Sequence, residues 1–215
     1  MCQIKTVVWD WNGTLLNDVD MNLEIVNKML FDHNIPSISK EHYQSIFTFP
    51  IFNFYKALGL DTDKEDMYYM LVKNYNEEYR KKMFEVSLYP RTEEILALLR
   101  QRDVQQIILS GQNQKDLDKQ IEFFGIKHYF DFIVGSSEKD ASDKEKQFLR
   151  LIENQNIEST NILVIGDTVY DYQLASALEC QCVLLSHGHQ SNFFLRETSA
   201  SIFTGFTDEF VKLFF

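Results

Sequence analysis

The chain has 215 residues, of which 45% are hydrophobic, and it carries a formal net charge of −11 at pH 7. This length and composition provide for one large core, or for one core with a small accessory lobe, and argue against three lobes. Because the charge is negative and the sequence has no run of Lys or Arg, we expect small-molecule ligands, with no nucleic acid, no membrane surface and no obligate protein partner.

The predicted location is the cytoplasm, because the sequence lacks the features of export. Lys5 is the only basic residue ahead of the first apolar stretch, which is too short for a signal peptide. No apolar segment reaches the length of a transmembrane helix. Cys180 and Cys182 have no partner pair or histidine at metal-site spacing, so we expect reduced thiols.

The first predicted element is a buried strand that ends in polar residues. Residues 7–15 read V-V-W-D-W-N-G-T-L. The apolar run 7–9 suits a strand in the core, and the Gly-Thr pair at 13–14 stops it. Asp10 and Asn12 should therefore lie where the chain leaves the core.

The next segment, residues 17–86, has the pattern of a helical insertion. Leu23, Val26 and Leu30 share one face of a predicted helix, and the same spacing recurs at 67–75. No convincing strand separates these helices. The aromatic run F-T-F-P-I-F-N-F-Y between them is interpreted as the core of this small lobe.

The remainder of the chain alternates helices and strands. Helical spacing is found at 92–102, 116–124, 144–153 and 171–178 and around residue 210, and apolar strand runs at 104–110, 130–135, 161–167 and 182–186. Strands separated by such helices are typical of a parallel sheet with helices on both faces. The predicted fold class is therefore α/β, a doubly wound parallel sheet with a small all-helical cap domain.

Polar residues follow three of the predicted strands. The first strand is followed by Asp10 and Asn12, the second by Ser110 and Gly111, and the fourth by Gly166, Asp167 and Asp171. Taken singly, a strand-end Asp or Ser commonly caps the next helix, and Asp171 alone would be a solvated first-turn carboxylate. The carboxyl ends of parallel strands meet at one edge, however, and three carboxylates crowded there require a hard cation such as Mg²⁺.

These residues resemble the motifs of a known family. D-W-N-G-T-L, I-I-L-S-G, a lysine ahead of a helix, and V-I-G-D-T-V-Y-D look like motifs one to four of the haloacid dehalogenase (HAD) superfamily, in the same order. The helical insertion is similar to that superfamily's small helical cap. The stretch L-Y-P-R-T-E-E-I-L-A-L-L-R resembles phosphoglycolate-phosphatase-like members, although Arg91 stands where glycine is usual. The resemblance implies a HAD-like Rossmannoid core of residues 1–16 and 87–215 and a cap of residues 17–86.

The resemblance also implies a mechanism. Asp10 would attack the phosphorus of a small phosphorylated metabolite and form an aspartyl-phosphate. Mg²⁺ would be held by Asp10, the backbone carbonyl of Asn12 and Asp167, with Asp171 orienting the metal or its waters. The phosphoryl group would be bound by the remaining expected site residues, which are Ser110, Gly111 and the turn residues Trp11, Gly13 and Thr14.

Three lysines are candidates for the third motif, which balances the carboxylates and touches the phosphate. Lys139, Lys144 and Lys146 all precede or begin the predicted helix at 144–153. We favour Lys144, because it stands at the helix start and at a family-like spacing from the Gly-Asp pair at 166–167.

Asn12 departs from the family pattern, in which a second aspartate protonates the leaving alcohol and then activates water. An amide cannot transfer a proton in this way, and losing such a group typically costs about 10²–10⁴-fold in rate. The first reading is a phosphatase for good leaving groups or with an acid from the cap, such as Glu41 or His42. The second reading is phosphonoacetaldehyde-hydrolase-like carbon–phosphorus cleavage, with Lys40 or Lys56 forming a Schiff base. The third is a non-catalytic phosphometabolite-binding protein.

Overall fold

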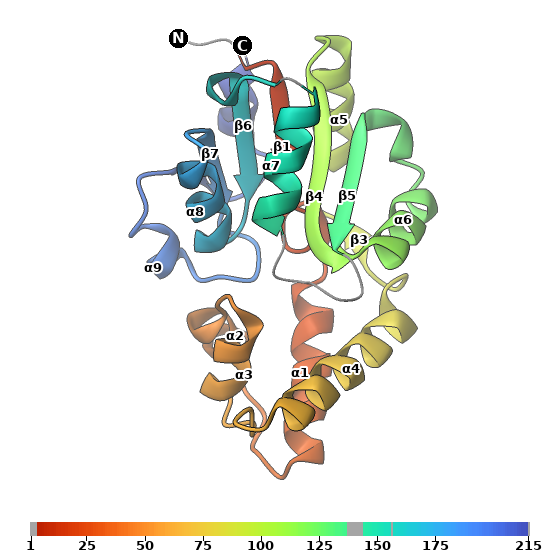
Figure 1. Ribbon diagram of the computed structural model, residues 1–215, viewed down its shortest axis with the longest axis vertical. Coiled ribbons are helices and arrows are strands. Elements are labelled where there is room, and N and C mark those ends of the chain that lie inside the picture. The colour runs from red at the N-terminus through yellow and green to blue at the C-terminus, as the bar shows by residue number, and fades with distance from the viewer. Residues whose placement is uncertain (1–3, 137–143, 156, 215) are drawn as a thin grey trace.

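The chain folds into two lobes, an α/β core and a helical cap (Figure 1). The structure is a computed structural model and describes residues 4–136, 144–155 and 157–214. Among the helices within these ranges, none combines the length and apolar character needed to cross a bilayer.

The core is built on a six-stranded sheet in which all paired neighbours are parallel, in the order β5-β4-β1-β6-β7-β8. Its strands are β1 Thr6–Trp9, β4 Gln105–Asn113, β5 Phe132–Ser136, β6 Ile162–Gly166, β7 Gln181–Leu185 and β8 Ser201–Phe203. The chain passes from β1 to one side of the sheet and then returns to the other side with β6. The switch point, where such sheets bind ligands, therefore lies at the carboxyl end of β1.

Helices cover both faces of this sheet, which confirms the predicted doubly wound class. They are α5 Thr92–Gln101, α6 Gln114–Phe123, α7 Lys144–Gln155, α8 Val169–Ala177, α9 Asn192–Leu195 and α10 Asp208–Val211, with 3₁₀ turns at Lys127–Tyr129, Ser159–Asn161 and Lys212–Phe214. Alternation along β1 separates the two faces: Trp9 packs with α5 and α6, and Val8 packs with Phe148 of α7 and Leu174 of α8.

Two strands of the core differ from the sequence-based expectation. β4 continues beyond Ser110 to Asn113, with a shift of register between Leu109 and Asn113. Its last residues are polar and partly exposed, so no apolar pattern marks them. β8 was not predicted, because it has only three residues and none of them is buried.

Four helices form the cap, which is the all-helical lobe expected from the sequence. They are α1 Val19–Asp32, α2 Lys40–Ile46, α3 Ile51–Ala57 and α4 Glu65–Lys82. They enclose an apolar cluster of their own, which includes Ile25, Leu30 and Leu71. Phe47 and Phe54 of the aromatic run belong to this cluster, as predicted.

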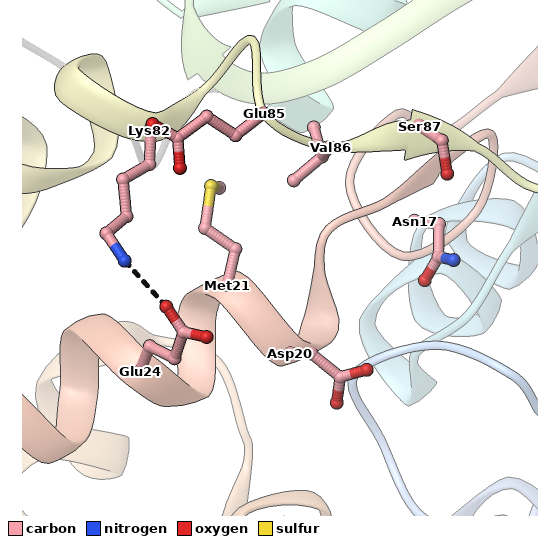
Figure 2. Close-up of a pocket in the computed structure, with 8 residues that line it drawn as sticks. All are labelled: Asn17, Asp20, Met21, Glu24, Lys82, Glu85, Val86 and Ser87. Atoms are coloured by element: carbon pink, nitrogen blue, oxygen red, sulfur yellow. Dashed lines mark hydrogen bonds and ion pairs between the residues drawn. The ribbon is translucent and has the colours of Figure 1, made fainter.

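Two short strands join the cap to the core. β2 Leu16–Asn17 leads into the cap and pairs antiparallel with β3 Ser87–Leu88, which leads out of it. A surface pocket of about 330 Å³ lies at this junction (Figure 2). At its rim the Lys82 ammonium of α4 is 2.6 Å from Glu24 Oε2 of α1. This ion pair links the two long cap helices next to the paired strands β2 and β3.

Candidate active site

Three carboxylates meet at the switch point. Asp10 follows β1, Asp167 follows the neighbouring β6, and Asp171 lies in the first turn of α8. One oxygen from each carboxylate lies within 4.8 Å of the others. Asp171 is only 2% exposed, and its Oδ2 accepts a hydrogen bond from the Thr168 hydroxyl at 2.7 Å. It therefore caps α8 and also belongs to the cluster, in place of the solvated position that its sequence context alone would indicate.

Lys144 supplies the positive charge of this cluster. It is the first residue of α7, and its side chain is 7% exposed. Its Nζ is 2.6 Å from Asp10 Oδ1 and 2.7 Å from Asp171 Oδ1. The alternative Lys146 is exposed on the same helix, and Lys139 lies outside the described residues.

The cluster holds more negative charge than its lysine balances. Burial raises the pKa of Asp10 to about 6, against the opposing charge of Lys144. Burial also raises the pKa of Asp167 to about 8; His189 opposes this shift, and the charges of Asp10 and Asp171 add to it. Burial alone would lower the pKa of Lys144, but the charges of Asp10 and Asp171 raise it well above its usual value. The site thus keeps its lysine charged while two carboxylates hold their protons unusually tightly.

These donors fit a hard divalent cation. Carboxylate and carbonyl oxygens are the ligands that Mg²⁺ prefers, and Asp10, Asp167 and Asp171 present three carboxylates in one small space. The backbone carbonyl of Asn12 receives no hydrogen bond from any described residue, so it is available as a further ligand. A cation would also relieve the crowding that raises the pKa values of Asp10 and Asp167.

The turn after Asp10 is packed tightly against this cluster. Gly13 has a positive φ of 74°, and a Cβ there would lie 2.4 Å from Asp167 Oδ2. The Thr14 hydroxyl donates to Asp167 Oδ1 at 3.1 Å. Glycine is therefore required at position 13 both for the backbone conformation and for the close approach to the carboxylate.

The predicted phosphate-binding amides of this turn fall into two groups. The Gly13 amide donates to Leu16 O and to Asp18 Oδ1, and the Thr14 amide donates to Trp11 O, so both are already engaged. The amides of Trp11 and Asn12 have no acceptor within the described ranges, which leaves them available to a ligand. The Trp11 indole is buried and donates to Gln120 Oε1 at 3.1 Å, so its side chain anchors the turn.

Ser110 and Gly111 lie at the adjacent strand, β4. Ser110 is buried, and its hydroxyl lies 3.5 Å from Asn12 Oδ1 and 3.1 Å from the Gln112 amide nitrogen. Gly111 is exposed, and a Cβ there would meet no atom within 4 Å. Ser110 therefore faces the turn beside Asp10, whereas Gly111 opens toward free space.

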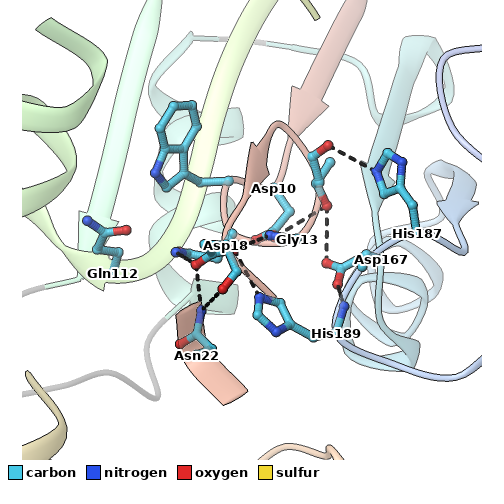
Figure 3. A network of polar contacts seen from close by, with 12 residues as sticks. Asp10, Gly13, Asp18, Asn22, Gln112, Asp167, His187 and His189 are labelled. Atoms are coloured by element: carbon cyan, nitrogen blue, oxygen red, sulfur yellow. Dashed lines mark hydrogen bonds and ion pairs between the residues drawn. The ribbon is translucent and has the colours of Figure 1, made fainter. Parts of the chain in front are cut away.

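The Asn12 side chain belongs to a buried polar network centred on Asp18 (Figure 3). Asp18 Oδ2 accepts from Asn12 Nδ2 at 2.7 Å and from Asn22 Nδ2 at 2.8 Å. Asp18 Oδ1 accepts from the Gly13 amide at 3.0 Å and lies 3.2 Å from His189 Nε2. The sequence analysis assigned Asp18 no role in the site, but its carboxylate organises the polar side chains beside Asp10.

His189 was missed by the sequence analysis. It lies in the loop after β7, its amide donates to Asp167 Oδ2 at 2.6 Å, and its ring stacks on Phe47 of the cap. Burial lowers the pKa of His189, but the charge and hydrogen bond of Asp18 outweigh this, and the net shift is upward. The residues H-G-H-Q directly after the strand run 182–186 are the signal that would have found it, because they occupy another carboxyl strand end at the same edge.

The same loop holds the cap against the core. Gln44 Nε2 of α2 donates to Gly188 O at 2.7 Å, and Gln190 Nε2 donates to the Phe47 carbonyl at 3.0 Å. Gln190 Oε1 accepts from the Val169 amide at the start of α8. The cap is therefore closed over the cluster by direct hydrogen bonds in this structure.

The cap residues considered as general acids or as Schiff-base lysines are not buried. Glu41 and His42 are exposed on α2. Lys56 is also exposed, and Lys40 pairs with Asp20 at 2.8 Å at the surface. Within residues 17–86, all of which the structure describes, no lysine is buried.

The close packing at Gly13 gives a direct prediction. Gly13→Ala is expected to lower the free energy of unfolding by about 1–3 kcal/mol, because the new methyl group meets Asp167 and the backbone is left-handed. Gly111→Ala is the matched control, and its change should stay within about 0.5 kcal/mol. Urea denaturation of both variants measures the difference, and equal stabilities would contradict the packing described for Gly13.

Comparisons with known proteins agree with this geometry. A family model described as haloacid dehalogenase-like hydrolase matches residues 7–185. A phosphoglycolate phosphatase from Haemophilus influenzae is 24% identical over 212 residues, covering 92% of each chain. A solved structure of a predicted phosphatase from Clostridium acetobutylicum superposes with a TM-score of 0.84, at 24% identity and 98% coverage of both chains. A haloacid dehalogenase-like hydrolase from Streptococcus pneumoniae gives 0.83, at 19% identity and coverage of 100% and 99%. The chain therefore belongs to the haloacid dehalogenase-like hydrolase family.

Proposed function

We propose that this protein is a Mg²⁺-dependent phosphatase that hydrolyses a small phosphorylated metabolite through an aspartyl-phosphate on Asp10. The observation that carries the proposal is the position of Asp10, a carboxylate at the switch point held beside Asp167 and Asp171 by a buried lysine. The names of the relatives, which are phosphoglycolate phosphatases and a predicted phosphatase, support the same reaction class.

The two oxygens of Asp10 have different partners, which suits one of them for attack. Oδ1 accepts from Lys144 Nζ at 2.6 Å, so this oxygen orients the carboxylate. Oδ2 has only the Thr14 hydroxyl, at 3.5 Å, among the described residues. Oδ2 is therefore the proposed nucleophile, and Lys144 fixes the direction in which it points.

The other residues of the site would bind and orient the phosphoryl group. The Ser110 hydroxyl and the amides of Trp11 and Asn12 are the donors available for its oxygens. Asp10, Asp167 and the Asn12 carbonyl would hold Mg²⁺, with Asp171 beside them. When bound, the cation supplies charge neutralisation for the transferring phosphoryl group.

In this structure the cap packs over the acidic cluster. Tyr43 and Phe47 of the cap pack against His189, and Tyr79 reaches Asn12, so aromatic and amide groups cover the cluster. A closed site excludes water, which strengthens the electrostatic interactions within it. Substrate entry then requires the hydrogen bonds between the cap and the loop at 188–190 to open.

The positions of the two candidate cap lysines do not favour the alternative of carbon–phosphorus cleavage. A Schiff base needs a lysine amine in the site, whereas Lys40 is held at the surface by Asp20 and Lys56 is exposed. The binding-protein alternative rests on Asn12 alone.

Phosphate release tests the proposal. Purified protein is incubated with Mg²⁺ and a panel of phosphate esters, acyl phosphates and phosphonoacetaldehyde, with EDTA as the metal-free control. We expect release that depends on Mg²⁺ from at least one phosphate compound. Release from phosphonoacetaldehyde alone, or binding of phosphate analogues with no turnover of any compound, would contradict it.

A further inference from the structure

The amide at position 12 points to the chemical class of the leaving group. Asn12 Nδ2 donates to Asp18 Oδ2 at 2.7 Å and to the Tyr79 hydroxyl at 2.8 Å, so both of its hydrogens are used. Its oxygen Oδ1 therefore faces Ser110, 3.5 Å from the hydroxyl. The side chain next to the proposed nucleophile thus presents an acceptor and has no proton to give to a leaving group.

Asp18 does not replace the missing acid. Its side chain is 0% exposed, and each of its oxygens already has two partners: Oδ1 has the Gly13 amide and His189, and Oδ2 has Asn12 and Asn22. No oxygen of this carboxyl group is left to contact a substrate.

His189 is also fully engaged. Its Nδ1 is 2.9 Å from the Tyr43 hydroxyl, and its Nε2 is 3.2 Å from Asp18 Oδ1. Both ring nitrogens therefore have partners within the protein, and stacking on Phe47 fixes the plane of the ring. Neither nitrogen is directed toward Asp10.

Tyr79 and Lys144 are two further buried groups, and both have partners as well. The Tyr79 hydroxyl accepts from Asn12 and donates its single hydrogen to Gln112 or Gln120, each at 3.3 Å. Lys144 is shared between Asp10 and Asp171. Asp18, His189, Tyr79 and Lys144 thus all have partners within the described protein, and Asp167, which is proposed to hold the cation with Asp10, would be charged when the cation is bound.

We propose that the substrate is an acyl phosphate, a carboxylic–phosphoric anhydride whose leaving group departs as a stable carboxylate without taking up a proton. This inference rests on the proposed function and narrows it to one substrate class. It differs from the alkyl esters of the related phosphatases, whose departing alkoxide requires an acid.

The two steps balance without a proton from any side chain. In the first, Asp10 Oδ2 forms a bond to phosphorus while the bond from phosphorus to the anhydride oxygen breaks, and the carboxylate leaves with the electron pair. In the second, water oxygen bonds to phosphorus while the bond to Asp10 breaks. One hydrogen of that water stays on its oxygen and the other passes to a phosphoryl oxygen, which gives dihydrogen phosphate and free Asp10.

Acetyl phosphate and ethyl phosphate are matched in size and test the leaving group. We expect kcat/KM for acetyl phosphate to exceed that for ethyl phosphate by about 10²–10⁴-fold or more, the effect of a missing general acid. Across a series of aryl phosphates, kcat/KM should fall steeply as the pKa of the phenol rises. Equal values for acetyl and ethyl phosphate, or a flat aryl series, would overturn the inference.

A double variant that exchanges two side chains tests whether the residue at position 12 determines the preference for acetyl phosphate. Asn12→Asp combined with Asp18→Asn exchanges the acid and the amide and keeps a hydrogen bond between the two positions. We expect this variant to raise kcat/KM for ethyl phosphate by about 10²–10⁴-fold relative to wild type, and so to narrow the preference for acetyl phosphate. Asp18→Asn alone is the control and should keep the preference for acetyl phosphate.

The outcomes separate this inference from the proposed function. Asp10-dependent release from ethyl and acetyl phosphate alike would preserve the phosphatase and reject the acyl phosphate class. No release from any phosphate compound would reject the phosphatase itself. The aryl phosphate series is measured on the wild-type protein, so the inference is tested even if the double variant does not fold.

Discussion

Asp10→Asn is expected to lower the rate of phosphate release by about 10⁴-fold or more, to the level of the uncatalysed background. Asn keeps the shape of the side chain but lacks the charged oxygen that attacks phosphorus. The Lys144 ammonium loses its partner at 2.6 Å but retains Asp171 at 2.7 Å, so the site keeps its packing. Initial rates of phosphate release for wild type and variant, with saturating Mg²⁺, measure the effect.

The melting temperature of Asp10→Asn is the control for correct folding. Burial raises the pKa of Asp10, which means that its charge is unfavourable in the metal-free protein. Asp10→Asn should therefore leave the melting temperature in EDTA unchanged or higher. A variant that melts like wild type and still releases phosphate at more than about one hundredth of the wild-type rate would exclude Asp10 as the nucleophile.

Lys144→Met is expected to lower the free energy of unfolding by about 3–5 kcal/mol in EDTA, the usual cost of removing one partner from a buried ion pair. Methionine fills a similar volume, but it leaves Asp10, Asp167 and Asp171 with no buried ammonium among them. Urea denaturation followed by circular dichroism measures the loss. Excess Mg²⁺ should restore part of the stability, because a bound cation favours the folded state by mass action.

Lys146→Met is the matched control on the same helix. Lys146 is exposed, so its substitution should change the free energy of unfolding by no more than about 1 kcal/mol, the range of a surface ion pair. Similar losses in the two variants would contradict the assignment of Lys144 as the buried counter-ion.

The convergence of the carboxylates was predictable because it follows from the topology of a parallel sheet. Apolar runs ending in Asp10 and Asp167 identify two strands, and the carboxyl ends of parallel strands share one edge. In the structure β1 and β6 are neighbours, with Trp9 opposite Ile165, which brings the two aspartates together. Lys144 was chosen on other grounds, from its position at the start of a helix and from a spacing to the Gly-Asp pair at 166–167 that resembles the family's third motif.

The network around Asp18 was not predictable from local pattern. Asp18 is 0% exposed because Asn22, His189 and Gly13 surround it, and these residues come from three separate segments of the chain. Burial of such a carboxylate depends on how the cap docks on the core, and the spacing of residues along one helix does not report that docking. The H-G-H-Q sequence after β7 was the available signal, but a histidine after a strand has many other roles.

Trapping the covalent intermediate tests the proposed aspartyl-phosphate on Asp10 most directly. Protein incubated briefly with acetyl phosphate and Mg²⁺ is quenched in acid, digested and analysed by mass spectrometry. We expect one phosphoryl group on the peptide that contains Asp10, and no such adduct in Asp10→Asn. Phosphate release with no adduct on that peptide, or an adduct that persists in Asp10→Asn, would contradict the aspartyl-phosphate on Asp10.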